Sequence, residues 1–262
     1  MEITGYLLAI LVGLSLGLIG GGGSILTVPI LIYCFKIEPI AATTYSLFVV
    51  GITSAAGSIT YYKNQNINLK ITLLFGLPSL LAVFLMRWFI MPSIPLHIIN
   101  TGSWELTKPV LILLVFAILM ILVAISMIRE KHQPVKLTND DINYSQLIIQ
   151  GIITGVITGF VGVGGGFLII PSLVLFAKMS MKKAVGTSLA IMTMSSLLGV
   201  TGDILQRTPI NYSFLALFSV FAVAGIVAGG ILSKSIDDTK LKPVFGWLVL
   251  TIGILILISE IV

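Results

Sequence analysis

Apolar segments long enough to cross a membrane follow one another along almost the whole chain, with short polar stretches between them. A transmembrane helix needs roughly 20 apolar residues. The candidate segments cover residues 4–35, 40–62, 69–91, 109–128, 146–177, 184–203, 211–233 and 241–259. No soluble fold has enough polar surface for a chain of 262 residues in which 57% are hydrophobic and 10% are charged. Because the alternating pattern of a membrane β-barrel is absent, we predict an all-α polytopic protein of the lipid bilayer.

The glycine-rich stretch GLIGGGGSILTVPIL at residues 17–31 has a near copy, GFVGVGGGFLIIPSL, at residues 159–173. A shift of 142 residues aligns the two without a gap and continues into the segments that follow. The shift pairs Gly17 with Gly159, Gly20 with Gly162, Gly22 with Gly164, Gly23 with Gly165, Pro29 with Pro171, Ala42 with Ala184, Ser46 with Ser188, Ser54 with Ser196 and Gly57 with Gly199. Matches of glycine, proline and serine in one register indicate a duplication.

The duplication predicts the domain organisation. We expect a first repeat over residues 1–128, a polar linker over 129–145 and a second repeat over 146–262. Internal repeats in membrane proteins are typical of transporters, whose substrate site lies at the repeat interface near the bilayer midplane.

Each repeat begins with an apolar segment of 32 residues, at 4–35 and 146–177, which is too long for one upright span and too short for two. Two short helices joined by a glycine loop solve this problem, either as one broken span or as a re-entrant hairpin. Glycine permits the positive φ angles of such a loop, and Pro29 and Pro171 fit the first turn of the second short helix or a kink just inside it. Each half is then a glycine-broken or re-entrant helix pair followed by three transmembrane helices. Irregular backbone at membrane depth is tolerated only inside protein or beside a water-filled cavity, so we expect the glycines to mark that cavity.

The distribution of the fifteen Lys and Arg residues separates the two architectures. With eight spans, six of them face one side and nine the other; with two hairpins and six spans, the division is four to eleven. In the hairpin arrangement the four are Lys36, Arg87, Lys108 and Arg207. The eleven are Lys63, Lys70, Arg129, Lys131, Lys136, Lys178, Lys182, Lys183, Lys234, Lys240 and Lys242. The stronger bias favours the hairpins, with both termini outside and the halves inverted, while the broken span stays open as the alternative.

Backbone N–H groups in a glycine loop at the start of a helix carry partial positive charge and suit an oxyanion. Hydroxyls on the segments that follow can donate hydrogen bonds to the same ligand. The candidate binding residues are Gly20, Gly22, Gly23, Ser24, Pro29, Tyr45 and Ser46 in the first half, and Gly162, Gly164, Gly165, Gly166, Pro171, Thr187 and Ser188 in the second. The alternative for any single residue is that small side chains merely let membrane helices pack closely.

The sequence argues against enzymes and nucleotide-driven pumps. An intramembrane protease would need a serine with a histidine or two aspartates at membrane depth, but His97 and His132 both lie in predicted loops. No GxxxxGK[ST] loop occurs, so transport is secondary or facilitated unless a separate ATPase subunit joins the chain. With Cys34 as the single cysteine, we predict no disulfide, metal site or cofactor. The net charge is +5, but the sequence contains no dense basic cluster. The charge therefore indicates loops that face anionic lipid rather than a nucleic-acid-binding surface.

Ionisable residues near membrane depth are candidates for coupling transport to protons or other ions, and only Asp203 and Arg87 come close, both at segment ends. We expect Asp203 to be an interfacial anchor, with a local ion pair to Arg207 four residues later. Proton or ion coupling stays open, and no homo-oligomeric state is predicted.

The stretches GLIGGGGSILTVPIL, GVITGFVGVGGGFLIIPSLVLF and AVGTSLAI at 184–191 resemble the TauE/SafE family of sulfite exporters, also called the toluenesulfonate uptake permease family. The resemblance covers nearly the whole chain. It implies transport of sulfite, sulfoacetate or another small sulfur-containing anion across the cytoplasmic membrane. On matching positions it implicates Gly20, Gly22, Gly23, Pro29, Gly162, Gly164, Gly165, Pro171, Thr187 and Ser188.

The first half departs from the second at Tyr45, where the second has Thr187, and at Gly21, where the second has Val163, so we expect a site with unequal halves. The sequence therefore predicts a secondary transporter of a small anion, with its site between the two glycine loops. A channel-like anion facilitator and a membrane scaffold that transports nothing are the alternatives.

Overall fold

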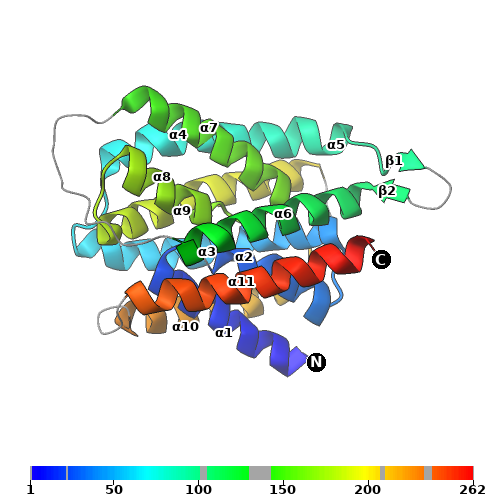
Figure 1. The fold of residues 1–262 in the computed structure, drawn as a ribbon, viewed down its shortest axis with the longest axis horizontal. Coiled ribbons are helices and arrows are strands. Elements are labelled where there is room, and N and C mark those ends of the chain that lie inside the picture. Colours follow the sequence, from blue (N-terminus) through cyan, green and yellow to red (C-terminus); the bar gives the residue numbers. More distant parts are fainter. Residues whose placement is uncertain are drawn as a thin grey trace.

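The computed structural model describes residues 2–21, 23–100, 105–129, 143–206, 210–232 and 238–261, nearly all of them helical (Figure 1). The first half contains α1 (Glu2–Ile19), α2 (Ser24–Pro29), the π-helix η1 (Ile30–Cys34), α3 (Pro39–Lys63), α4 (Leu69–Leu85), the π-helix η2 (Met86–Ile90), α5 (Met91–Ser93), β1 (His97–Asn100), β2 (Glu105–Thr107) and α6 (Lys108–Arg129). The second contains α7 (Tyr144–Val161), α8 (Gly166–Phe176), α9 (Met181–Leu205), α10 (Tyr212–Leu232) and α11 (Asp238–Ile261). The predicted all-helical class is confirmed.

Six stretches of described helix are long and apolar enough to cross a membrane. They are Pro39–Lys63, Leu69–Ser93, Lys108–Ser126, Tyr144–Val161, Met181–Leu205 and Tyr212–Leu232. Shorter apolar helices include Ser24–Cys34 and Gly166–Phe176, the second arms of the two glycine-rich segments. The chain is therefore a multi-pass membrane protein.

The first glycine-rich segment folds back on itself. The rings of Tyr6, near the start of α1, and Phe35, just after η1, have centroids 5.4 Å apart in an edge-to-face contact. Since the end of η1 returns to the start of α1, the two arms run antiparallel, and in Figure 1 the N-terminus and the start of α3 lie at the same end of the molecule. The segment is a hairpin rather than a broken span.

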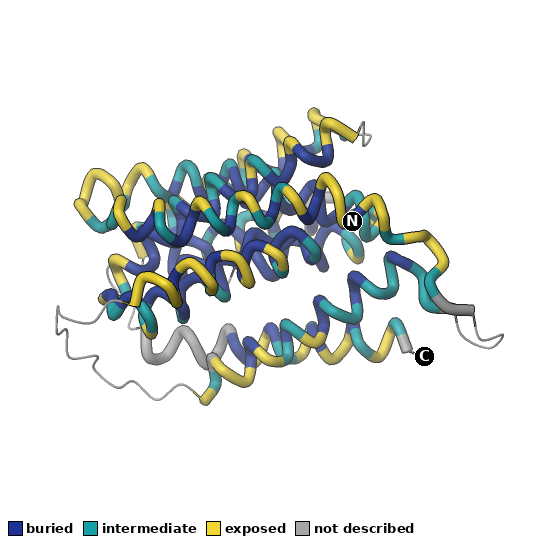
Figure 2. The backbone as a smooth tube through the Cα atoms, turned by 90° about the horizontal axis from the view of Figure 1, so that it is seen from above, coloured by how far each residue is buried: buried dark blue, intermediate teal, exposed yellow. Residues whose placement is uncertain are grey.

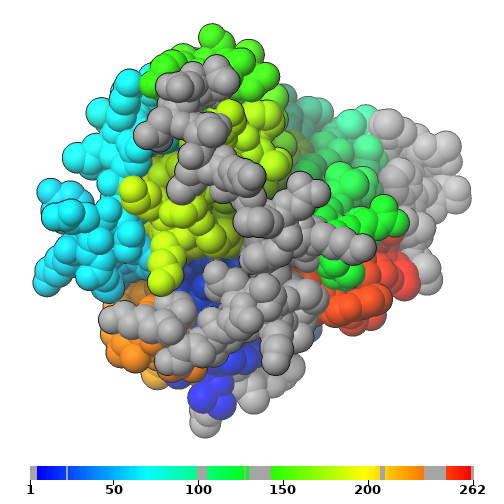
Figure 3. All heavy atoms as spheres, turned by 60° about the vertical axis from the view of Figure 1, so that its left-hand side comes forward, coloured from blue at the N-terminus to red at the C-terminus, as the bar shows by residue number. Residues whose placement is uncertain are grey.

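The second glycine-rich segment forms a hairpin that enters from the opposite end. In Figure 1, α7 starts and α8 ends at the end of the molecule away from both termini. Figure 3 shows this end, where the yellow-green residues around the start of α9 lie between the cyan residues of the α3–α4 turn and the orange residues of α10. The two hairpins are thus inserted from opposite ends, as the inverted arrangement requires.

The helices of the two halves pack in matching ways. The first hairpin packs through α1 along α10, and the second packs through α7 along α4. The most buried spans, α3 and α9, cross at the centre, while α6 and α11 pair along one side of the bundle (Figure 2). This correspondence is what the predicted duplication would produce.

The connection between α5 and α6, which the sequence predicts only as a loop, contains the strands β1 and β2. They pair antiparallel with an irregular register, and the His97 Nδ1 and Glu105 Oε2 atoms lie 3.9 Å apart. The two strands have four and three residues, so neither is long enough to show a clear alternating pattern in the sequence.

The hairpins can be tested by accessibility. In a Cys34→Ser background, we expect Lys63→Cys and Lys183→Cys to react with an impermeant maleimide from the same side of the membrane, and Glu38→Cys from the other side. A broken span would instead put positions 38 and 183 on one side and position 63 on the opposite side. Mass spectrometry of labelled right-side-out and inverted vesicles makes the comparison.

Candidate functional site

The tips of the two hairpins touch. A Cβ atom added to Gly21 would lie 2.3 Å from the carbonyl carbon and oxygen of Gly166, and one added to Gly166 would lie 2.6 Å from the Cα of Gly21. Such an approach is open only to glycine, because any side chain would overlap the opposite backbone. The predicted meeting of the two glycine loops is therefore present, although Gly22 itself lies outside the described residues.

Positive φ angles give the loops their shape. Gly20 ends α1 with a φ of +80°, and Gly162, Gly164 and Gly165 have φ angles of +77°, +75° and +73°. Other residues adopt this backbone region only at a cost in energy. Gly23 lies on the first hairpin in ordinary helical geometry, with a φ of −63°.

The two central spans enclose the tips. A Cβ on Gly20 would overlap Val185 in the second turn of α9, and one on Gly162 would overlap Thr43 in the second turn of α3. Nearer the middle of these helices, Gly164 approaches Val50 and Gly166 approaches Met192. The contacts of Gly20 and Gly162 are related by the same shift of 142 residues that relates the sequences, since Thr43 corresponds to Val185. The tips therefore meet about half-way along α3 and α9.

Buried hydroxyls border the second loop. A Cβ on Gly164 would lie 3.2 Å from Oγ of Ser196, and one on Gly165 would lie 2.1 Å from Oγ1 of Thr158. Neither hydroxyl has a hydrogen-bond partner among the described residues. Buried polar groups are normally paired, so these two are available to a ligand or to water. Five further buried hydroxyls also have no hydrogen-bond partner among the described residues: Thr27, Ser46, Thr53, Ser54 and Ser219.

Other predicted hydroxyls have partners within the protein. Ser24 Oγ donates to the carbonyl of Gly21 at 2.8 Å and so stabilises the first loop. Ser188 Oγ donates to the carbonyl of Val185 at 2.8 Å, within its own helix. Among the predicted serines, only Ser46 is both buried and without a partner in the described structure.

Tyr45 and Thr187, which the 142-residue shift aligns, play matching roles. The hydroxyl of Tyr45 accepts the backbone N–H of Asn211 at 2.8 Å, and that of Thr187 accepts the backbone N–H of Asn68 at 3.1 Å. Each asparagine in turn caps the next helix, because its side chain accepts a backbone N–H three residues later. Both hydroxyls therefore stabilise the first turn of a helix. A contact of either hydroxyl with substrate remains a prediction.

The two prolines lie inside the second arms of the hairpins rather than in their first turns. Pro29 is the sixth residue of α2 and Pro171 the sixth of α8. Proline lacks the N–H of a regular helical hydrogen bond, and α2 widens into the π-helix η1 directly after Pro29. Pro29 and Pro171 therefore help to shape the second arm of each hairpin.

A buried ion pair lies beside the second loop. Arg87, on the π-helix η2, is 2% exposed, and its Nη1 donates to Oδ2 of Asp203 at 3.1 Å and to Oγ1 of Thr43 at 3.0 Å. Thr44 Oγ1 donates to the same carboxylate oxygen at 2.8 Å. Asp203 is 6% exposed, so the prediction of an interfacial anchor is wrong. Its partner comes from another helix, whereas Arg207 lies outside the described residues.

The ion pair touches the tip of the second hairpin. A Cβ on Gly162 would lie 2.6 Å from Nη2 of Arg87, so the guanidinium packs directly against the loop. The network therefore joins α3, η2, α9 and the second hairpin. The sequence signal for it was the rarity of ionisable residues within the apolar segments, because such residues are costly in a membrane and mark functional positions.

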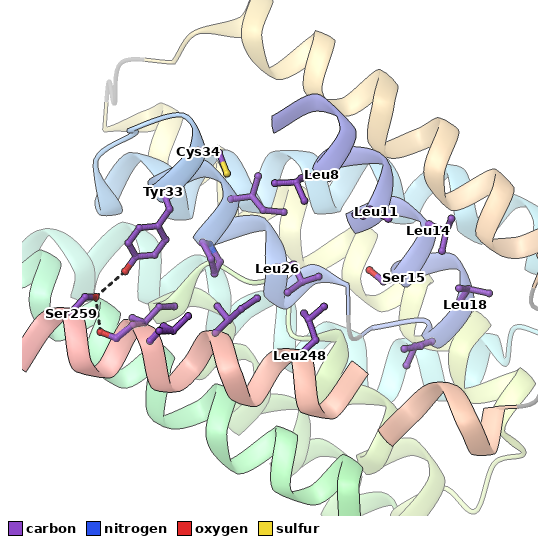
Figure 4. A pocket seen from close by; sticks show the side chains of 16 residues that line it. Leu8, Leu11, Leu14, Ser15, Leu18, Leu26, Tyr33, Cys34, Leu248 and Ser259 are labelled. Atoms are coloured by element: carbon purple, nitrogen blue, oxygen red, sulfur yellow. Dashed lines mark hydrogen bonds between the residues drawn. The ribbon is translucent and has the colours of Figure 1, made fainter. Parts of the chain in front are cut away.

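An apolar cavity of about 650 Å³ lies between the first hairpin and α11 (Figure 4). Leucine and isoleucine side chains line most of it, and a hydrogen bond of 3.2 Å between the hydroxyls of Tyr33 and Ser259 lies at one edge. A wall with so few donors cannot compensate the lost hydration of an anion. We therefore place the candidate anion site at the hairpin tips.

Two hairpins inserted from opposite ends, whose tips meet inside a bundle of membrane-length helices, define a membrane transporter. The model of the family described as sulfite exporter TauE/SafE matches residues 6–256. The chain belongs to this family, which is a family of transporters rather than enzymes.

Curated relatives agree with this class. A probable membrane transporter protein of Xylella fastidiosa is 28% identical over 94% of this chain and 91% of its own length. One from Methanocaldococcus jannaschii is 30% identical over 77% of this chain and 73% of its own, and YdhB of Bacillus subtilis is 27% identical over 90% and 92%. No solved structure matches the chain.

The fit of the second loop can be tested with Gly162→Ala. The new methyl group would overlap Thr43 and Arg87 and would require a positive φ, which by itself costs about 1–2 kcal/mol. We expect a lower midpoint of thermal unfolding in detergent. Gly230→Ala is the matched control, because its Cβ would meet nothing within 4 Å. Equal midpoints for both variants would contradict the described packing.

Proposed function

We propose that the protein is a secondary transporter that moves a small anion, sulfite or an organosulfonate such as sulfoacetate, across the cytoplasmic membrane. The anion binds between the two glycine loops. The observation that carries this proposal is the contact of Gly21 with Gly166 about half-way along α3 and α9. The family name supports sulfite as the substrate, and the names of the relatives support transport across a membrane.

The electrostatics at the tips supports an anion. The helix α8 begins at Gly166, so its first N–H groups and the positive end of its dipole point to the meeting place of the loops. The hydroxyls of Ser196 and Thr158 add neutral donors beside the same loop. Donors of this kind can replace the hydration of an anion without introducing a permanent charge that would hold it too tightly.

The arrangement of the hairpins supports a carrier with alternating access. The two hairpins enter from opposite ends of the molecule, and their tips meet between these ends. Movement of one hairpin at a time would open the site to one side and then to the other. A channel-like facilitator would use the same loops, and its flux would not saturate.

The transport assay is flux into proteoliposomes. We expect labelled sulfite to enter in a protein-dependent and saturable way, and unlabelled sulfoacetate to compete with it better than chloride. An imposed proton gradient, varied in sign, would reveal coupling to protons. Protein-dependent flux that does not saturate would favour the facilitator, and flux equal to that of empty liposomes for every anion would overturn the proposal.

The site itself is tested by Gly164→Leu. A side chain there would begin 2.4 Å from Cγ1 of Val50 with a φ of +75°, so the loop cannot keep its shape. We expect sulfite flux to fall to the level of empty liposomes while membrane insertion is retained. Val220→Leu, at a position on α10 that is 64% exposed, should retain flux. Normal flux in Gly164→Leu would remove the loop from the mechanism.

A further inference from the structure

The ion pair uses only part of the hydrogen-bonding capacity of Arg87. Nη1 makes both contacts of the guanidinium, with Asp203 and Thr43. Nε and Nη2 have no hydrogen-bond partner among the described residues, although the residue is 2% exposed. A buried donor without a partner is costly, and two on one charged group are more so. The arrangement therefore favours a ligand that accepts from both atoms.

The two nitrogens define the kind of ligand. Nε and Nη2 form one edge of the planar guanidinium, and their N–H bonds point in nearly parallel directions. This edge matches two oxygen atoms of a single oxyanion, as in bidentate pairs of arginine with carboxylate or phosphate. A halide would have to accept both N–H groups at one centre, which bends both hydrogen bonds away from their preferred direction.

The free edge borders the second hairpin. Nη2 packs against Gly162, two residues before Gly164, whose added Cβ would lie 3.2 Å from Oγ of Ser196. Arg87 belongs to η2, which lies between α4 and α5 in the chain. This end of α4 is at the end of the molecule where both termini lie (Figure 1). An anion that moves between that end and the hairpin tips would meet this edge.

Neither charge of the ion pair recurs at the repeat-related positions. The 142-residue shift relates Arg87 to Gly229 and Asp203 to Tyr61. A small cavity of about 90 Å³ lies at this place, lined by residues that include Gly57, Tyr61 and Gly230. The guanidinium is therefore a one-sided addition to a nearly symmetric frame.

We propose that the Nε–Nη2 edge of Arg87 is an oxyanion subsite, which binds two oxygens of a sulfite- or sulfonate-like anion beside the second glycine loop. This inference rests on the proposed function. Asp203 neutralises the guanidinium when the subsite is empty and reduces its attraction for the anion, so the anion is recognised by geometry and can still leave.

The test uses Arg87→Lys, which keeps the positive charge beside Asp203 and removes the fork of donors. Binding is measured as the concentration-dependent rise in the thermal unfolding midpoint of the purified protein with sulfite, sulfoacetate or chloride. We expect the apparent Kd for sulfite and sulfoacetate to rise at least about tenfold, because a charge-assisted hydrogen bond is lost. The preference of both oxyanions over chloride should shrink by the same factor.

Two further variants make the result decisive. The double variant Arg87→Gln with Asp203→Asn removes both charges, so no unpaired carboxylate is left to unfold the protein, and it should lose the same oxyanion preference. Arg129→Lys, at an exposed position near the end of α6, is the matched control and should bind as the unmodified protein does.

The outcomes separate this subsite from the proposed function. Unchanged sulfite binding in both Arg87 variants would overturn the subsite and leave the glycine loops as the anion site. Absence of stabilisation by sulfite and sulfoacetate in the unmodified protein would also overturn the subsite, whereas the transport function is decided separately by flux into proteoliposomes.

Discussion

The arrangement of the bundle depends on two backbones that approach each other where no side chain fits. Gly21 and Gly166 are in contact half-way along α3 and α9, and both loops there depart from helical geometry. Irregular backbone at membrane depth must be surrounded by protein or line a polar cavity. The two central spans supply that surrounding, and the remaining helices pack around them. A chain with alanine at these positions could not bring the two hairpins together.

A second constraint comes from charge. Arg87 and Asp203 are nearly excluded from solvent, at 2% and 6% exposure. Burial of an ion pair does not in general stabilise a fold, since desolvation offsets the attraction between the charges. A contribution to stability therefore does not by itself explain the pair beside Gly162, and the oxyanion subsite proposed above would give it a role.

The hydroxyl-rich helices α3 and α9 show how similar residues divide into different roles. Tyr45 and Thr187 hold the starts of α10 and α4 through the backbone N–H groups of Asn211 and Asn68. Ser196 instead has no hydrogen-bond partner among the described residues, beside the second loop. The sequence grouped these residues by type and position along the chain. Which of them stay available depends on where the neighbouring loops come to lie.

The sequence by itself determined the membrane class, the two glycine-rich segments and, through the distribution of Lys and Arg, the preference for hairpins over broken spans. These features follow from local composition and from the side of the membrane that each loop faces. Only the tertiary structure decided the partner of Asp203. The spacing of four residues between side chains on one helix predicted an ion pair with Arg207. The observed partner, Arg87, is 116 residues away in the chain. Contacts between distant segments depend on how helices cross, and the pattern within a single helix does not contain that information.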